Sequence, residues 1–561
     1  MSKKIKYSSN QLAKYIADAP GVVKNYIQAL EKQVGNLANI GLALSKEKNM
    51  SKLLEMILIE AKRIANSDGG TLYMMTDDNR LRFEIMMTDS LDFHMGGTSG
   101  KEIPFYPVKL YDEEGNPNKS MIAAYVGLTG ETVNIPDAYK AKGFDFSGTK
   151  MFDEKTGYHS QSFLTVPLKN HEDEIIGVLQ LLNAQNNNTK KIIPFASDIQ
   201  EMVEALASQA AVAITNKNLI KDLEALFESF IKLIASAIDA KSPYTGGHCA
   251  RVPEITMLLA KAVQETIDGP FADISFTDKE MYELKIAAWL HDCGKVATPE
   301  FVVDKSTKLE TIYDRVNEVE TRFAALKRDE QIKSLRNELK VERDDSLSKE
   351  EKLIKIKTLK SKYSKKLREL KSDLEFIKES NIGGEFMSGD KKDRVHNISN
   401  YRWKPNGKME NFLSEDEVYN LTIPRGTLTA EERKVINDHI VVTINMLEEL
   451  PYPKHLKNVP EFAGGHHEKL DGTGYPKGLI KDEMSVQARI MAIADIFEAL
   501  TAKDRPYKKG KTLSQAMRIL GFMKNDAHID VDLFDIFVKD KIYLKYAEEH
   551  LDPDQIDEVQ M

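Results

Sequence analysis

The spacing of apolar residues in the first part of the chain predicts three helical stretches. Residues 1–34 have an amphipathic pattern, which indicates a packing or dimerisation helix. A second helix is predicted at 50–64, where the polar run 66–70 ends it. A long helix begins near Ala196.

Period-two patterns predict short strands between these helices. The last two strands are separated by the turn residues 170–173, which favours a hairpin. Residues 35–218 therefore predict an α+β domain with one antiparallel sheet and helices packed on it. The predicted strands are 71–75, 81–87, 162–168 and 175–182.

Residues 219–241 form a linker in which apolar residues recur at alternating spacings of four and three. This heptad seam predicts a helix that pairs in parallel with the same helix of a second chain. A helix that faces the core of its own chain gives the same stripe, so both interpretations stand. The seam consists of Leu219, Leu223, Leu226, Phe230, Leu233, Ala237 and Ala240.

Two later helical stripes end in residues that can bind metal. The apolar face over 284–288 continues at His291, which Asp292 follows directly, and the face over 488–492 continues at Asp495. Burying a charged group costs free energy unless a partner compensates it. A metal ion is a suitable partner because its ligands share its charge, and a buried His–Asp ion pair is the alternative.

Adjacent histidines His466 and His467 lead into a loop that contains Gly472 and Gly474. Glycine allows the backbone to turn tightly and to approach a ligand. Imidazole and carboxylate are the usual protein ligands of iron, manganese and zinc.

Two further histidines complete a candidate ligand set. The set exceeds what one tetrahedral site needs and suits two metals bridged by a carboxylate. Two metals about 3.5–4 Å apart support in-line displacement at phosphorus, which predicts hydrolysis of a phosphate ester. The candidate metal ligands are His248, His291, Asp292, His439, His466, His467 and Asp495.

Composition narrows the class of protein. With 561 residues, the chain is expected to form about two to four domains. The net charge of −9 gives no reason to expect a nucleic-acid polymer, and no apolar run is long enough for a membrane span. Two cysteines cannot form a disulfide framework, so a cytoplasmic protein is expected.

A charged segment separates His291 from His439. Residues 311–379 predict a helical hairpin, coiled-coil-like, with helices at 326–341 and 353–377. Residues 380–425 read as irregular. The segment is interpreted either as a solvated spacer or as an arm or lid that binds a partner.

Motifs in the α+β segment resemble the GAF domain family. The resemblance leaves the ligand open, because residues 150–154 match the cyclic-nucleotide pattern poorly. Cys249 and Cys293 lie outside this segment, so no cysteine is available for a bilin. An unknown ligand and a ligand-free dimerising scaffold are both compatible. The motifs lie at 127–130, 133–138, 152–158, 166–168 and 176–183.

The ligand motifs closely resemble the HD-GYP family, through 291–295, 466–476 and 494–507 in this order. The resemblance implies an all-α, metal-dependent phosphodiesterase that opens cyclic di-GMP to pGpG, sometimes onward to GMP. It implies iron or manganese as the metal. Some members hold a third metal with an acidic residue shortly before the first histidine. Residues 241–244 of this chain contain no acidic residue, which favours two metals.

The same resemblance assigns roles to individual residues. Asp292 would bridge the metals, and Asp292 and Lys295 would be catalytic. Lys295, Arg505 and Lys508 would bind substrate phosphates, and Tyr475 would shape the substrate pocket.

The predicted organisation is an α+β GAF domain followed by an all-α HD-GYP domain with a helical insertion. We expect a cytoplasmic homodimer, paired through its linker helices, that hydrolyses cyclic di-GMP. Another cyclic dinucleotide, such as cyclic GMP-AMP, and a signalling scaffold with a non-catalytic site are the alternatives. The predicted boundaries are 1–34 for the N-terminal helix, 35–218 for the GAF domain and 219–241 for the linker. The HD-GYP domain is predicted at 242–309 and 426–535, with the insertion at 310–425 between its two parts. A C-terminal helix with an acidic tail is predicted at 536–561.

Overall fold

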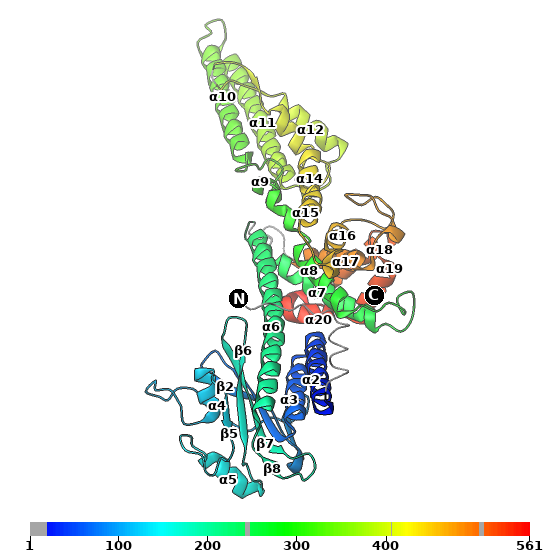
Figure 1. Cartoon of the computed structure of the whole chain (residues 1–561). Coiled ribbons are helices and arrows are strands. Elements are labelled where there is room, and N and C mark those ends of the chain that lie inside the picture. The colour runs from blue at the N-terminus through cyan, green and yellow to red at the C-terminus, as the bar shows by residue number, and fades with distance from the viewer. Residues whose placement is uncertain (1–19, 242–246, 406, 504–509, 561) are drawn as a thin grey trace, which may run out of the picture. The chain divides into compact units, whose positions relative to one another are not determined.

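A computed structural model describes residues 20–241, 247–405, 407–503 and 510–560 of the chain (Figure 1). The chain forms two compact units that divide between Ala225 and Leu226. Among the described residues, no helix is long and apolar enough to cross a membrane.

One antiparallel sheet forms the centre of the first unit, in the order β3-β2-β1-β7-β6-β5, with β4 beside β2 and β8 beside β7. The predicted α+β architecture is confirmed, and the predicted hairpin is β6 paired with β7. The strands are β1 Ser67–Met75, β2 Arg80–Thr88, β3 Phe93–Gly96, β4 Val108–Lys109, β5 Val133–Ile135, β6 Phe163–Lys169, β7 Ile175–Gln185 and β8 Ile192–Ile193.

Helices α3 and α6 cover one face of this sheet through a shared apolar core. The second helix ends at Ala65, as predicted, with Asn66 as its C-cap, and β1 begins at Ser67, four residues before its predicted start at 71. A Cβ at Gly70 would lie 2.7 Å from Leu58 Cδ1, so α3 packs directly on this strand. The helices of this unit are α2 Gly21–Lys46, α3 Met50–Ala65, α4 Ile122–Thr129 and α5 Ser147–Thr156.

The N-terminal helix can be compared with its prediction only in part. Residues 1–19 lie outside the described residues. The helix that follows, α2, continues to Lys46 and so passes the predicted end at residue 34.

Helix α6, Ser197–Lys241, is continuous over 45 residues. Toward its end, Ile231, Ala235 and Ile238 are buried in the core of the second unit. The predicted heptad seam lies on another face and is exposed: Leu223 is 66% exposed and Phe230 is 55% exposed. The seam is therefore not the core-facing stripe of its own chain, which was the alternative interpretation.

The second unit is helical and has one large apolar core. Several of its helices begin at side chains that bind free backbone N–H groups, such as Thr277 before α8 and Ser485 before α17. These helices are α7 His248–Glu265, α8 Asp278–Leu290, α9 Glu300–Val303, α14 Ala430–Asn437, α15 His439–Glu448, α16 Val459–Gly464, α17 Val486–Thr501, α18 Leu513–Asn525, α19 Val531–Lys539 and α20 Ile542–His550.

Helices α14 and α15 meet at Asp438. The Ile436 carbonyl accepts a hydrogen bond from His439 Nδ1, which competes with the regular backbone bond at this point. His439 is therefore the first residue of α15 rather than a residue inside a helix.

The segment between His291 and His439 contains the predicted helical hairpin. Helices α10 and α11 lie side by side, and Asp344–Ser346 fall in the turn between them (Figure 1). Residues 380–425 are more regular than predicted, because their apolar residues pack onto the base of the hairpin. The elements are α10 Val316–Glu342, α11 Lys349–Ile382, α12 Gly389–Ser399, β9 Arg402–Trp403, β10 Glu410–Asn411 and α13 Glu415–Leu421.

Two buried lysines tie the ends of this insertion together. Lys308 Nζ donates to the carbonyl oxygens of Leu421 at 3.0 Å and Ile423 at 2.9 Å. Lys305 Nζ binds Asn420 Oδ1 at 2.9 Å and the Glu432 carboxylate at 2.8 Å. The two ends of the insertion therefore lie next to each other.

Candidate metal centre

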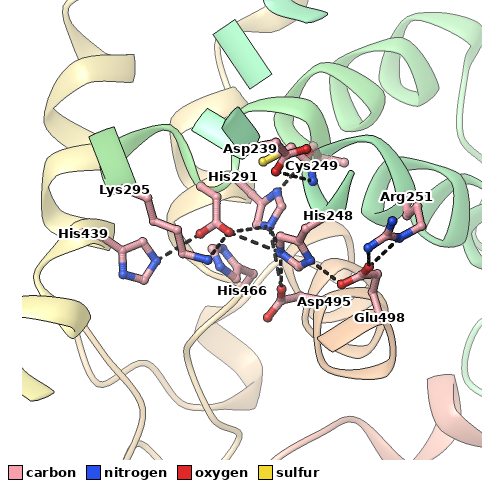
Figure 2. Close-up of polar contacts among 12 residues, drawn as sticks. Asp239, His248, Cys249, Arg251, His291, Lys295, His439, His466, Asp495 and Glu498 are labelled. Carbon is pink, nitrogen blue, oxygen red and sulfur yellow. Dashed lines mark hydrogen bonds and ion pairs between the residues drawn. The ribbon is translucent and has the colours of Figure 1, made fainter. Parts of the chain in front are cut away.

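All seven predicted metal ligands meet in the second unit, in two adjoining groups, and Figure 2 labels five of them, His248, His291, His439, His466 and Asp495. The ligand atoms within each group lie within 4.8 Å of one another. Helices α7, α15 and α17 and the segments after α8 and α16 supply them. The first group is His248, His291 and Asp495, and the second is Asp292, His439, His466 and His467.

The Asp292 carboxylate lies between these groups. Its Oδ2 lies 3.2 Å from His248 Nε2 and 3.4 Å from His291 Nε2. Its Oδ1 lies 3.2 Å from His439 Nε2 on the other side. Each oxygen of one carboxylate thus faces a different group, which is the arrangement of a bridging ligand.

Three histidines are oriented by the same contact with the backbone. In each, Nδ1 lies within hydrogen-bonding distance of the carbonyl three residues earlier, at 2.8 Å for His291 and 2.6 Å for His466, and likewise for His439. A carbonyl oxygen can only accept, so Nδ1 carries the proton. Nε2 is then the atom that points into the site, with a lone pair available for a metal.

His248 is oriented instead by a carboxylate that the sequence analysis missed. His248 Nδ1 contacts Glu498 Oε2, and Glu498 Oε1 accepts from Arg251 Nε at 2.7 Å (Figure 2). Glu498 is fully buried. It follows Asp495 by three positions on α17, so the same helical face that predicted Asp495 also contains Glu498.

Burial and neighbouring charges set the protonation of the ligands. Burial lowers the pKa of His467 to about 4 and that of His466 well below its ordinary value, so both imidazoles are neutral. Burial raises the pKa of Asp292, but the nearby charges of Lys295 and His291 lower it by a larger amount. The pKa of this carboxyl therefore lies well below its ordinary value. Neutral imidazoles and an ionised bridging carboxylate are the forms that bind metal.

Two kinds of observation test whether these residues fit a metal: buried polar atoms without a hydrogen-bond partner, and ring nitrogens that lie close together. Asp292 Oδ1 and His466 Nε2 are buried and have no hydrogen-bond partner among the described residues. In addition, His291 Nε2 lies 3.3 Å from His248 Nε2, and His467 Nε2 lies 3.3 Å from His439 Nε2. Burial lowers the pKa of His248 and His291, but the neighbouring carboxylates raise it by more, to about 9 for His291. These imidazoles therefore carry protons that a metal ion would replace, and the donor set suits first-row divalent metals.

Two of the four predicted substrate-binding residues, Lys295 and Tyr475, lie in the described part of the chain beside the metal ligands. Lys295 Nζ lies 2.5 Å from Asp292 Oδ2, and its side chain is 27% exposed. The Tyr475 ring stacks on His467, with ring centroids 4.8 Å apart, so both residues border the second group. Arg505 and Lys508 lie outside the described residues.

Two glycines permit close approaches of the backbone at the site. A Cβ at Gly294 would lie 2.0 Å from the His439 carbonyl oxygen, and a Cβ at Gly474 would lie 2.3 Å from Lys469 N. Buried Glu468 accepts hydrogen bonds from Lys477 N at 2.7 Å and Leu479 N at 2.9 Å, which fixes the loop after the adjacent histidines.

The first unit contains a cavity of about 520 Å³, largely lined by aromatic and other apolar residues. Among the described residues that line it there is no lysine, arginine or histidine. Asp153, part of the weak cyclic-nucleotide pattern, instead accepts bonds from Tyr139 Oη at 2.7 Å and Ser160 N at 2.8 Å. That carboxylate has a structural role.

A model of a known protein family matches part of each unit. Residues 49–214 match the GAF domain family, and residues 415–533 match the HD domain family. The chain contains an N-terminal GAF domain and an HD domain. The HD match begins at residue 415, near the end of the insertion, and the structure adds His248, His291 and Asp292 from before the insertion to the same site. The HD domain family is metal-dependent, as the ligand groups of this chain would require.

Several phosphodiesterases are similar to part of this chain. A 3'3'-cGAMP-specific phosphodiesterase 3 of Vibrio cholerae is 39% identical over 107 residues, which is 19% of this chain and 22% of that protein. A cyclic di-GMP phosphodiesterase of Pseudomonas aeruginosa is 45% identical over 74 residues, covering 13% and 17%. One of Thermotoga maritima is 39% identical over 93 residues, covering 17% and 25%. The matches thus span only about a quarter or less of these relatives, and they support the predicted resemblance of the HD domain.

Glu498→Gln should weaken metal binding by about 10- to 100-fold, because it removes the charge that orients His248. Manganese affinity measured by titration checks this, with the exposed Glu548→Gln as the control. Equal affinities for the two variants would show that Glu498 does not support the site.

Proposed function

We propose that this protein is a metal-dependent phosphodiesterase that hydrolyses cyclic di-GMP to linear pGpG. The observation that carries the proposal is the Asp292 carboxylate, which faces one group of histidines with each oxygen. The similarity of the HD domain to cyclic di-GMP phosphodiesterases supports the substrate class.

The cofactor in this proposal is a pair of divalent ions, iron or manganese. His248, His291 and Asp495 would hold one ion, His439, His466 and His467 the other, and Asp292 both. When bound, the two ions supply Lewis acidity for in-line displacement at phosphorus.

The remaining residues bind and orient the substrate. Lys295 is partly exposed beside the bridging carboxylate and offers a cation to a phosphate oxygen. Tyr475 forms one border of the pocket through its stack on His467. Arg505 and Lys508 are proposed to bind the second phosphate.

A second candidate substrate is 3'3'-cGAMP, because a Vibrio cholerae relative specific for it is similar to the HD domain. The two substrates share the phosphodiester and differ in one base. The predicted metal ligands do not distinguish between the two bases, so the turnover of both compounds must be compared.

Protein purified without oxygen and supplied with Mn²⁺ or Fe²⁺ should hydrolyse cyclic di-GMP, and Asp292→Ala should abolish turnover. The reason is that the two carboxylate oxygens of Asp292 face histidines of both groups. Product chromatography with each dinucleotide checks this. Faster turnover of 3'3'-cGAMP would favour the second candidate, and no turnover with two metals per chain would contradict both.

Lys295→Ala should lower turnover by at least about tenfold while metal content stays unchanged, because the ammonium is assigned to substrate phosphate rather than to the metal. Elemental analysis and initial rates check this, with the exposed Lys454→Ala as the control. Loss of metal in Lys295→Ala would instead assign the lysine to the support of Asp292.

The chain is further proposed to form a parallel homodimer through the exposed seam of α6. Leu226→Glu with Phe230→Glu should yield monomers, since charges on both helices would repel along the seam. Light scattering coupled to size-exclusion chromatography measures the mass, with Lys221→Glu as the control. A dimer that persists in the double variant would place the interface elsewhere.

A further inference from the structure

The last turn of α6 contacts both parts of the metal centre that precede the insertion. Asp239 and Lys241 make these contacts, and neither is a candidate ligand. Both lie within the second unit, although α6 itself begins at Ser197, inside the segment that matches the GAF family.

Asp239 binds the start of α7 on both sides of His248. Its Oδ2 accepts a hydrogen bond from Gly247 N at 3.1 Å, and its Oδ1 accepts one from Cys249 N at 3.3 Å (Figure 2). The carboxylate is buried, and it satisfies N–H groups that the first turn of a helix leaves free. The backbone of His248 is thus held between two bonds to one side chain.

Lys241 binds the turn that follows Asp292. Its Nζ donates to the carbonyl oxygens of Lys295 at 3.1 Å and Thr298 at 2.6 Å, and also to that of Val296. These carbonyls end the short 3₁₀ helix 293–297, where a cation is electrostatically favourable. The same ammonium therefore fixes the backbone of Lys295.

We propose that Asp239 and Lys241 are positioning residues that set the distance between His248 and the bridging Asp292. The two ligands come from separate segments, and their contact at 3.2 Å depends on how those segments are placed. One helical turn holds both segments. An axial shift or a rotation of α6 would consequently change the metal centre.

This inference rests on the proposed metal centre and deepens it, because it makes the linker helix part of the site. It also gives a mechanism by which the GAF domain would influence catalysis. A movement of α6 would reach the metal centre, and no ligand would have to pass between the domains. The seam that is proposed to pair in the dimer lies on the same helix, so a change in pairing would reach the same turn.

The test compares full-length variants of the two residues. Lys241→Met keeps the length of the side chain and removes the charge, Lys241→Arg restores the charge, and Asp239→Asn removes one acceptor charge. Lys221→Met and Asp222→Asn are matched controls, since both residues are exposed on the same helix. The readouts are Mn²⁺ affinity, the electron paramagnetic resonance spectrum of the loaded protein, and kcat and KM for cyclic di-GMP.

We expect Lys241→Met and Asp239→Asn to bind Mn²⁺ about 10- to 100-fold more weakly, as for other residues that orient metal ligands. The spectrum of the exchange-coupled Mn²⁺ pair should change, kcat should fall more than KM rises, and Lys241→Arg should recover part of each loss. The controls should match the unmodified protein.

Wild-type affinity and an unchanged spectrum in both variants would overturn the proposal. It would also be overturned if Lys241→Arg recovered nothing while both Lys241 variants lowered the unfolding midpoint of the metal-free protein, because these residues would then support the fold alone. If the unmodified protein bound two Mn²⁺ without hydrolysing cyclic di-GMP, the proposed substrate would fail, and affinity and spectrum would still decide the role of α6.

Discussion

The buried carboxylate of Asp292 is the interaction on which the HD domain depends. An ionised carboxylate inside a protein costs free energy unless cations surround it. Here Lys295, His248 and His439 lie around it, and the last two belong to different groups of ligands. The helices that converge on this residue consequently form one centre rather than two separate ones.

Much of this centre could be predicted from helical periodicity. His291 and Asp495 each continue an apolar stripe, which is why the sequence predicts that they are buried and need a partner. Glu498 lies on the same stripe and was missed, because a carboxylate that contacts only another side chain has no motif of its own. Arg251 was missed for the same reason, since its partner is distant in sequence.

Tertiary packing accounts for the predictions that failed. Ser67–Gly70 have the composition of a turn, yet β1 already begins at Ser67, four residues before its predicted start, and α3 packs directly on Gly70. Residues 380–425 have few regular patterns, yet they fold because Phe412 and Leu421 are buried against the hairpin. Local preference yields in both places to contacts with residues far away in the sequence.

The lysines that close the insertion have a consequence for how the HD domain assembles. Three of the seven predicted metal ligands precede residue 310 and four follow residue 425, so an unstructured connection would add loop-closure entropy, about 0.6 kcal/mol for each doubling of length. Lys305 and Lys308 bring the two ends together within a segment that has its own core. Once that segment has folded, the two halves of the HD domain are in effect consecutive, as if joined by a short loop.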